Sequence, residues 1–137
     1  KSRLHIGCYI VSSVGKVLVN GSFDLSGKTA IVIGGGGGIG GTTAEMYAGK
    51  GANIAVVDCK DNVEDVAIEL AAKYGVKTIG LRCDVTIQTE VENIVSKVVD
   101  TFGEINILAN MPGYVELERA SSIDIDVIER HIAINAV

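Results

Sequence analysis

A run of glycines at residues 34–41 constrains the fold of this chain more than any other feature. The run reads GGGGGIGG, with seven glycines in eight positions, and it predicts a loop, because glycine loses more backbone freedom than other residues in a strand or helix. The β-branched, apolar segment TAIVI comes directly before it at residues 29–33, and good helix formers follow at residues 42–50. The three segments predict a buried strand, a glycine loop and a helix that is capped by Gly51.

The rest of the sequence repeats this alternation of strand and helix. Three further strands are expected, at residues 53–57, 78–83 and 105–109. Among the intervening helices, Asp61 with Glu64 resembles a capping box, and Ser121 with Asp124 resembles another helix start. Strands that alternate with helices form right-handed crossovers, so the sequence predicts an α/β fold with a parallel sheet and flanking helices.

Composition and charge exclude several classes of function. The formal net charge is -5 and the pI is about 4.9, so no broad basic surface is expected for binding a nucleic acid. No apolar run reaches the ~18 residues that a membrane span needs. Cys8, Cys59 and Cys83 form no CxxC pair and have no metal-ligand spacing with either histidine. We expect no metal, and we interpret the cysteines as small buried residues of a reducing, cytoplasmic compartment.

Residues 1–22 differ in pattern from the rest of the chain. Lys1 and Arg3 precede a moderately apolar stretch that loosely suggests a signal peptide, but glycines, serines and a lysine interrupt it. We therefore divide the chain into an N-terminal extension at residues 1–22, with a strand or hairpin as its expected structure, and one domain at residues 23–137.

The glycine loop is a candidate phosphate site. A backbone without Cβ atoms can approach a pyrophosphate closely, and the N-terminus of the next helix offers N–H groups and a positive dipole. Spacing alone leaves the register open, because GxGxxG fits twice and GxxxGxG fits Gly34, Gly38 and Gly40. The segment GKT at residues 27–29 resembles the end of a P-loop, but a strand follows it where a P-loop requires a helix. We therefore reject the P-loop.

An acidic residue supports the nucleotide interpretation. Asp58 closes the second expected strand, 18 residues after Gly40, near the ~20 at which dinucleotide-binding folds place a carboxylate for the ribose hydroxyls. That carboxylate would repel a 2′-phosphate, so Asp58 favours NAD over NADP. The alternative is an aspartate that begins a solvated turn.

Several motifs together resemble the short-chain dehydrogenases/reductases, over residues 23–137. LSGKTAIVIGGGGGIG at residues 25–40 is similar to that family's first strand and TGxxxGIG loop, and CDVT at residues 83–86 is similar to the segment after its third strand. NILANMPG at residues 106–113 resembles the family's DILVNNAG. HIAINAV at residues 131–137 resembles the helix that carries its structural and catalytic Asn.

The resemblance implies a Rossmann-type dinucleotide-binding domain. It also implies which residues form the site. The implied cofactor-binding positions are Gly34, Gly38, Ile39, Gly40, Asp58, Asp84, Val85, Asn110 and Gly113. The implied catalytic residue is Asn135, which would hold a water or a backbone link in the proton relay. Two departures affect one hydrogen-bond system: Ile33 stands where the family has a Thr, and Met111 and Pro112 stand where it has Asn and Ala. We expect weaker cofactor binding or a less stable sheet.

The implied function is that of an NAD(H)-dependent oxidoreductase, which transfers hydride between nicotinamide and a carbonyl or secondary alcohol of a small alcohol or ketone substrate. In this family the catalytic Ser and the Tyr-xxx-Lys pair lie downstream of the Asn, and residues 1–137 contain no YxxxK. We therefore interpret the chain as the cofactor-binding half, truncated after the fourth strand and the helix that follows it. A non-catalytic NAD-binding module and a truncated, self-associating remnant are the alternatives. The family also implies a homo-oligomer.

Overall fold

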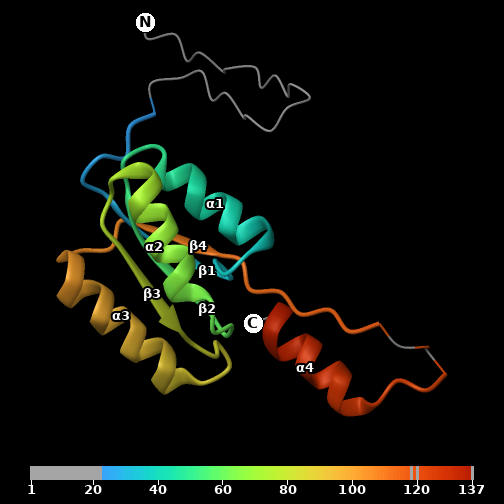
Figure 1. The fold of residues 1–137 in the computed structure, drawn as a ribbon. Coiled ribbons are helices and arrows are strands. Elements are labelled where there is room, and N and C mark those ends of the chain that lie inside the picture. Colours follow the sequence, from blue (N-terminus) through green and yellow to red (C-terminus); the bar gives the residue numbers. More distant parts are fainter. Residues whose placement is uncertain (1–22, 118, 120, 137) are drawn as a thin grey trace, which may run out of the picture.

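Four strands and four helices alternate along the part of the chain that a computed structural model describes, which is residues 23–117, 119 and 121–136 (Figure 1). The elements are β1 (Thr29–Ile33), α1 (Gly38–Ala48), β2 (Asn53–Asp58), α2 (Val63–Tyr74), β3 (Thr78–Arg82), α3 (Gln88–Phe102), β4 (Ile107–Asn110) and α4 (Ile125–Asn135). The extension predicted for residues 1–22, with Cys8, lies outside the described residues.

The strands form one parallel sheet in the order β3-β2-β1-β4. Val32 of β1 pairs with Val56 of β2 on one side and with Ala109 of β4 on the other. Because all four strands run in one direction, their carboxyl ends meet at the same edge of the sheet. The chain order changes direction between β1 and β4, which is where open parallel sheets bind ligands. The predicted Rossmann-type α/β class is confirmed.

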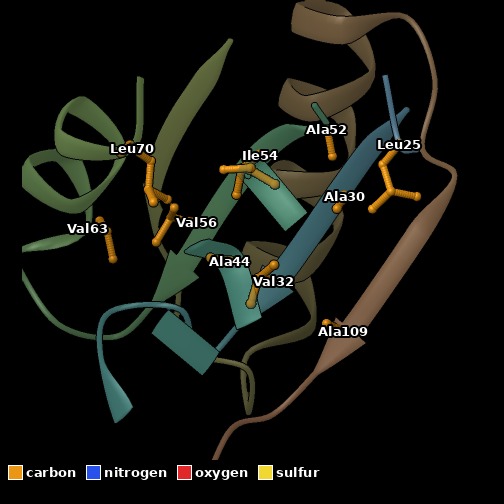
Figure 2. Packing of buried hydrophobic residues seen from close by; sticks show 12 residues of the cluster. Leu25, Ala30, Val32, Ala44, Ala52, Ile54, Val56, Val63, Leu70 and Ala109 are labelled. Carbon is orange, nitrogen blue, oxygen red and sulfur yellow. The ribbon is translucent and has the colours of Figure 1, made fainter. Parts of the chain in front are cut away.

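Side chains alternate between the two faces of each strand, and helices cover both faces of the central strands. Both faces are therefore buried. On one face, Val32, Ile54 and Val56 pack with residues of α1 and α2, as Figure 2 shows. On the other face, Ala55 and Val57 pack with residues of α3. The apolar, β-branched runs that predicted these strands therefore fill two separate cores, one on each side of the sheet.

Helix α1 begins earlier than predicted, at Gly38 and within the glycine run. The expectation that the whole run is a loop was therefore wrong. A Cβ atom on Gly40 would lie 2.2 Å from the carbonyl oxygen of Gly34, so the first turn of the helix packs directly against the end of β1. Close packing of backbone on backbone explains why the sequence accepts the poor helix propensity of glycine at this position.

Three other local expectations were also wrong. The N-cap of α2 is Asn62 rather than Asp61, whose carboxylate instead pairs with Arg82 at 3.0 Å. Helix α4 begins after Asp124, whose side chain accepts a hydrogen bond from the Asp126 amide, and not at Ser121. Helix α1 ends at Ala48 and its C-cap is Gly49 rather than Gly51. At the end of α2, the C-cap residue Gly75 adopts the left-handed conformation (φ 69°), which glycine tolerates best.

The last two elements are the least covered part of the structure. Helix α4 contains no buried residue, and Figure 1 shows it joined to β4 by a long connecting segment. Leu108 of β4 keeps 63% of its surface exposed. No helix among the described residues has the length and hydropathy needed to cross a membrane.

Candidate functional site

A cleft of about 360 Å³ lies at the carboxyl edge of the sheet. Eight of the predicted site residues line it: Gly34, Gly38, Ile39, Gly40, Asp58, Asp84, Val85 and Gly113. Asn110 ends β4 and Asn135 ends α4, and neither is part of the lining. The segments after β1, β2, β3 and β4 thus meet around one cleft. They do so because parallel strands place their carboxyl ends at the same edge of the sheet.

The glycine loop has the backbone geometry of the GxxxGxG register. Gly34 has φ 79°, and a Cβ atom on it would lie 2.3 Å from the Met111 carbonyl oxygen, so no side chain fits. Gly38 has φ 57°, and a Cβ atom there would meet no atom within 4 Å. Gly40 is required by its contact with Gly34. The three glycines of this register therefore serve three separate purposes: a turn, an open cradle and a close helix-to-strand contact.

The N-terminus of α1 faces this cradle with its backbone donors uncapped. Its N-cap residue, Gly37, offers no side-chain acceptor, and the first turn carries no acidic side chain. The first N–H groups of a helix have no partner within the helix, and the helix dipole places partial positive charge there. An anion such as a phosphate is the ligand that this arrangement favours.

Three hydrogen bonds hold the glycine loop, two from the end of β2 and one from the start of α2. The Gly35 N–H donates to the Val57 carbonyl oxygen at 3.0 Å. The Gly36 N–H donates to Oδ2 of Asp58 at 3.0 Å, and the Gly36 carbonyl oxygen accepts from Nδ2 of Asn62 at 3.0 Å. Asp58 therefore lies against the glycine loop, and both line the cleft.

The second oxygen of Asp58 has weaker partners. Its Oδ1 accepts from the Lys60 amide at 3.3 Å and from the Cys59 thiol at 3.6 Å. Partial desolvation and the neighbouring Asp58 charge raise the pKa of the Cys59 thiol, so the thiol stays protonated and is a poor nucleophile. A carboxylate has about four lone-pair positions, which leaves Asp58 capacity to accept further hydrogen bonds from a ligand.

The prediction that the cysteines are buried holds for one of the two described cysteines. Cys83 is 1% exposed and belongs to the core beneath α3, as predicted. Cys59 is exposed, and the prediction that it is buried was wrong. It follows Asp58 directly and so lies beyond the end of β2, where the strand leaves the core.

Asp84 begins the turn between β3 and α3. Its Oδ1 accepts from both the hydroxyl and the amide of Thr86, at 2.7 and 3.0 Å. These two hydrogen bonds, followed by the charges of Arg130 and Arg82, hold the pKa of the Asp84 carboxyl below its usual value. The turn keeps Asp84 and Val85 on the cleft.

The departures at the end of β4 leave the backbone contact intact. The Met111 N–H donates to the Ile33 carbonyl oxygen at 3.0 Å, and the thioether of Met111 accepts from the Thr43 hydroxyl at 3.5 Å. The loop after β1 and the segment after β4 are therefore joined through main-chain atoms, without the side-chain hydroxyl that Ile33 lacks. The expected loss of affinity or sheet stability stays a prediction.

Asn135 holds the segment after β4 rather than lining the cleft. Its Oδ1 accepts from the Tyr114 amide at 3.0 Å, and its Nδ2 donates to the Tyr114 carbonyl oxygen at 2.9 Å. Around the same tyrosine, the Arg130 guanidinium lies 4.7 Å from the ring centroid and the His131 ring 4.8 Å. These contacts bring α4 to the cleft edge, while the catalytic role of Asn135 stays a prediction.

Sequence reasoning did not single out several residues that the fold brings to the site. Lys60, Arg130 and Ile134 line the cleft, and Asn62 binds the loop beside it. Lys60 carries a usable signal, because it follows Asp58 by two residues. The others come from helices whose approach to the cleft depends on tertiary packing, so spacing in the sequence does not reveal them.

Comparison with known proteins places these features in a family. The family model for short chain dehydrogenases matches residues 28–137. The chain is 31% identical over 113 residues to an NAD-dependent glycerol dehydrogenase of Listeria innocua, an alignment that covers 82% of this chain and 43% of the relative. It is 36% identical over 118 residues to a D-threitol dehydrogenase of Mycolicibacterium smegmatis, covering 85% and 45% of the two chains. The chain thus spans less than half the length of these relatives.

Solved structures agree with the sequence comparison. A short-chain type dehydrogenase/reductase from Mycobacterium marinum superposes with a TM-score of 0.77 at 32% identity, covering 82% of this chain and 46% of that one. L-sorbose reductase from Gluconobacter frateurii, solved with NADPH and L-sorbose, gives a TM-score of 0.74 at 29% identity, covering 82% and 43%. The glycine loop, the sheet order and these matches agree, and the chain belongs to the short chain dehydrogenase family.

Proposed function

We propose that this chain binds NAD(H) in the cleft at the carboxyl edge of the sheet. The observation that carries the proposal is the position of Asp58, whose carboxylate adjoins a loop without side chains at the N-terminus of α1. The helix terminus and the Gly38 cradle suit the diphosphate, and Asp58 suits the two hydroxyls of the adenosine ribose. Asp84 and Val85 would flank the adenine, and Asn110 and Gly113 would lie toward the nicotinamide.

The residues present fit a dinucleotide. The open space beside Gly38 is the space that a Cβ atom would fill, and a diphosphate needs that close approach to the backbone. Bound NAD(H) supplies a hydride donor or acceptor at its nicotinamide. The residues of this chain bind and orient the cofactor, and Asn135 positions the segment that begins at Tyr114.

For a protein of the full length that the relatives have, we propose an oxidoreductase that interconverts a small secondary alcohol and its ketone. Support comes from relatives whose names specify glycerol and threitol as substrates. A cytoplasmic location and a homo-oligomer complete the proposal. The relatives do not decide between NAD and NADP, because one is NAD-dependent and one solved relative holds NADPH. The proposed preference for NAD therefore rests on Asp58.

Calorimetric titration of the protein with NAD and with NADP tests the cofactor assignment. We expect NAD to bind more tightly, and we expect Asp58→Ser to weaken NAD while strengthening NADP relative to it. The ratio of the two dissociation constants is the readout, because loss of the Gly36 contact weakens both cofactors alike. Asp61→Ser is the matched control, since Asp61 pairs with Arg82 and is not part of the cleft lining. An unchanged ratio in Asp58→Ser contradicts the ribose assignment.

Turnover by a protein of the full length that the relatives have separates the oxidoreductase from the binding module. With NAD and glycerol or threitol, the appearance of NADH absorbance supports hydride transfer. Tight NAD binding without turnover of any secondary alcohol supports the non-catalytic alternative.

A further inference from the structure

Asn62 occupies a helix-capping position but does not cap its helix. It is the N-cap of α2, and its side chain makes no cap hydrogen bond there. An asparagine at an N-cap ordinarily accepts a hydrogen bond from the second or third amide of the helix. Instead, Nδ2 of Asn62 donates to the carbonyl oxygen of Gly36, 26 positions earlier in the chain. The side chain therefore connects the start of α2 to the glycine loop.

The carbonyl group that Asn62 binds belongs to a peptide between two glycines, Gly36 and Gly37. Peptide planes between glycines can rotate with little steric resistance, because both residues accept positive and negative φ. The trans peptide is planar, so its N–H points away from its C=O. The Asn62 hydrogen bond thus determines the direction of the Gly37 N–H.

Gly36 is held from its other side as well. Its own N–H donates to Asp58, and a Cβ atom on Gly36 would lie 2.9 Å from Oδ2 of Asp58. Gly37 lines the cleft and has φ 157°, and it directly precedes the first turn of α1. The peptide that Asn62 orients therefore leads into Gly37, the N-cap residue of the helix that offers its N–H groups to the cleft.

We propose that Asn62 is a positioning residue, which holds the Gly36 and Gly37 peptide in the orientation that presents the Gly37 N–H to the cofactor diphosphate. The proposal rests on the proposed NAD(H) site and assigns to it a residue outside the glycine motif. In the free protein, the hydrogen bond keeps one peptide orientation populated. The cofactor then binds without the cost of selecting that orientation.

Asn62→Ser tests this role with little risk to the fold, because serine is itself a good N-cap but is too short to reach the Gly36 carbonyl. We expect the dissociation constants for NAD and for ADP to rise about five- to tenfold, as fits the loss of one preorganising hydrogen bond. Adenosine has no phosphate, so its dissociation constant, from NMR shift titration, should stay unchanged. The Gly37 amide signal should broaden or double as the peptide samples two orientations.

Asn53→Ser is the matched control, because Asn53 also makes one side-chain hydrogen bond, to the Lys77 amide, at the opposite end of β2. Equal NAD affinity in Asn62→Ser and wild type overturns the inference. Equal weakening of NAD and adenosine also overturns it, and so does an equal loss in Asn53→Ser. Failure of the wild-type protein to bind NAD contradicts the proposed function instead, so the two failures are distinguishable.

Discussion

Strands β2 and β4 have similar apolar sequences but very different surroundings. Ile54 in β2 is fully buried, whereas Leu108 in β4 keeps 63% of its surface exposed. The difference arises because β2 lies inside the sheet, with helices on both faces, whereas β4 is at the edge of the four described strands and Leu108 belongs to neither buried core cluster of the described residues. Burial therefore contributes to stability on both faces of β2, whereas at β4 it comes from the face that carries Ala109.

Truncation of the two leucine-sized side chains should give the largest contrast. Ile54→Ala creates a cavity in the core and should lower the free energy of unfolding by about 2 to 5 kcal/mol. Leu108→Ala removes an exposed side chain and should cost less than about 0.5 kcal/mol. Urea unfolding of both variants measures the difference. Equal losses would show that β4 is as well covered as β2.

The next largest effect should come from two glycines, one at the start of α1 and one at the end of α2. Gly38 and Gly75 both have positive φ and open space where a Cβ atom would lie. Alanine at either position should cost about 1 to 2 kcal/mol of stability. Only Gly38 lines the cleft, so Gly38→Ala should also weaken NAD binding about tenfold or more, measured by calorimetry, while Gly75→Ala should not. Equal affinities would place the diphosphate elsewhere.

At the β4 end, local order should depend on a single amide side chain. Asn135→Ala removes both hydrogen bonds to the Tyr114 backbone, which is worth about 1 to 2 kcal/mol of local stability. We expect hydrogen exchange at the Tyr114 amide to become about tenfold faster or more, with exchange in β1 and β2 unchanged. Faster exchange throughout the sheet, or no change at Tyr114, would contradict this assignment.

The smallest effect should be the pH dependence that Asp84 contributes. Its pKa is lowered in the folded protein by the Thr86 hydrogen bonds, so its stabilising contribution is present above the unfolded pKa of about 3.9. That contribution is lost as the pH falls through the lower, folded pKa. Because Asp84 is exposed, the difference between wild type and Asp84→Asn at neutral pH should be under about 0.5 kcal/mol and should shrink in acid. Denaturant unfolding across that range measures it, and a difference that grows in acid would reverse the sign.

Local pattern predicted most of the elements and much of the cleft. Short, continuous apolar runs identified all four strands of the described residues to within two residues at each end, because a strand buried on both faces must be apolar throughout. The same pattern was poor at helix starts. Asp61 binds Arg82 and Asn62 binds Gly36, so tertiary partners compete for the side chains that would otherwise cap α2.

The sequence by itself determined the α/β alternation, the glycine loop before α1 and the acidic residue after β2, because backbone propensity and short spacings are local properties. Only the tertiary structure decided that Asn62, Lys60 and Arg130 reach the loop or the cleft. It also decided that Leu108 stays exposed while Ile54 is buried. Burial and contact depend on which elements become neighbours in space, and the order of strands in the sheet sets those neighbours.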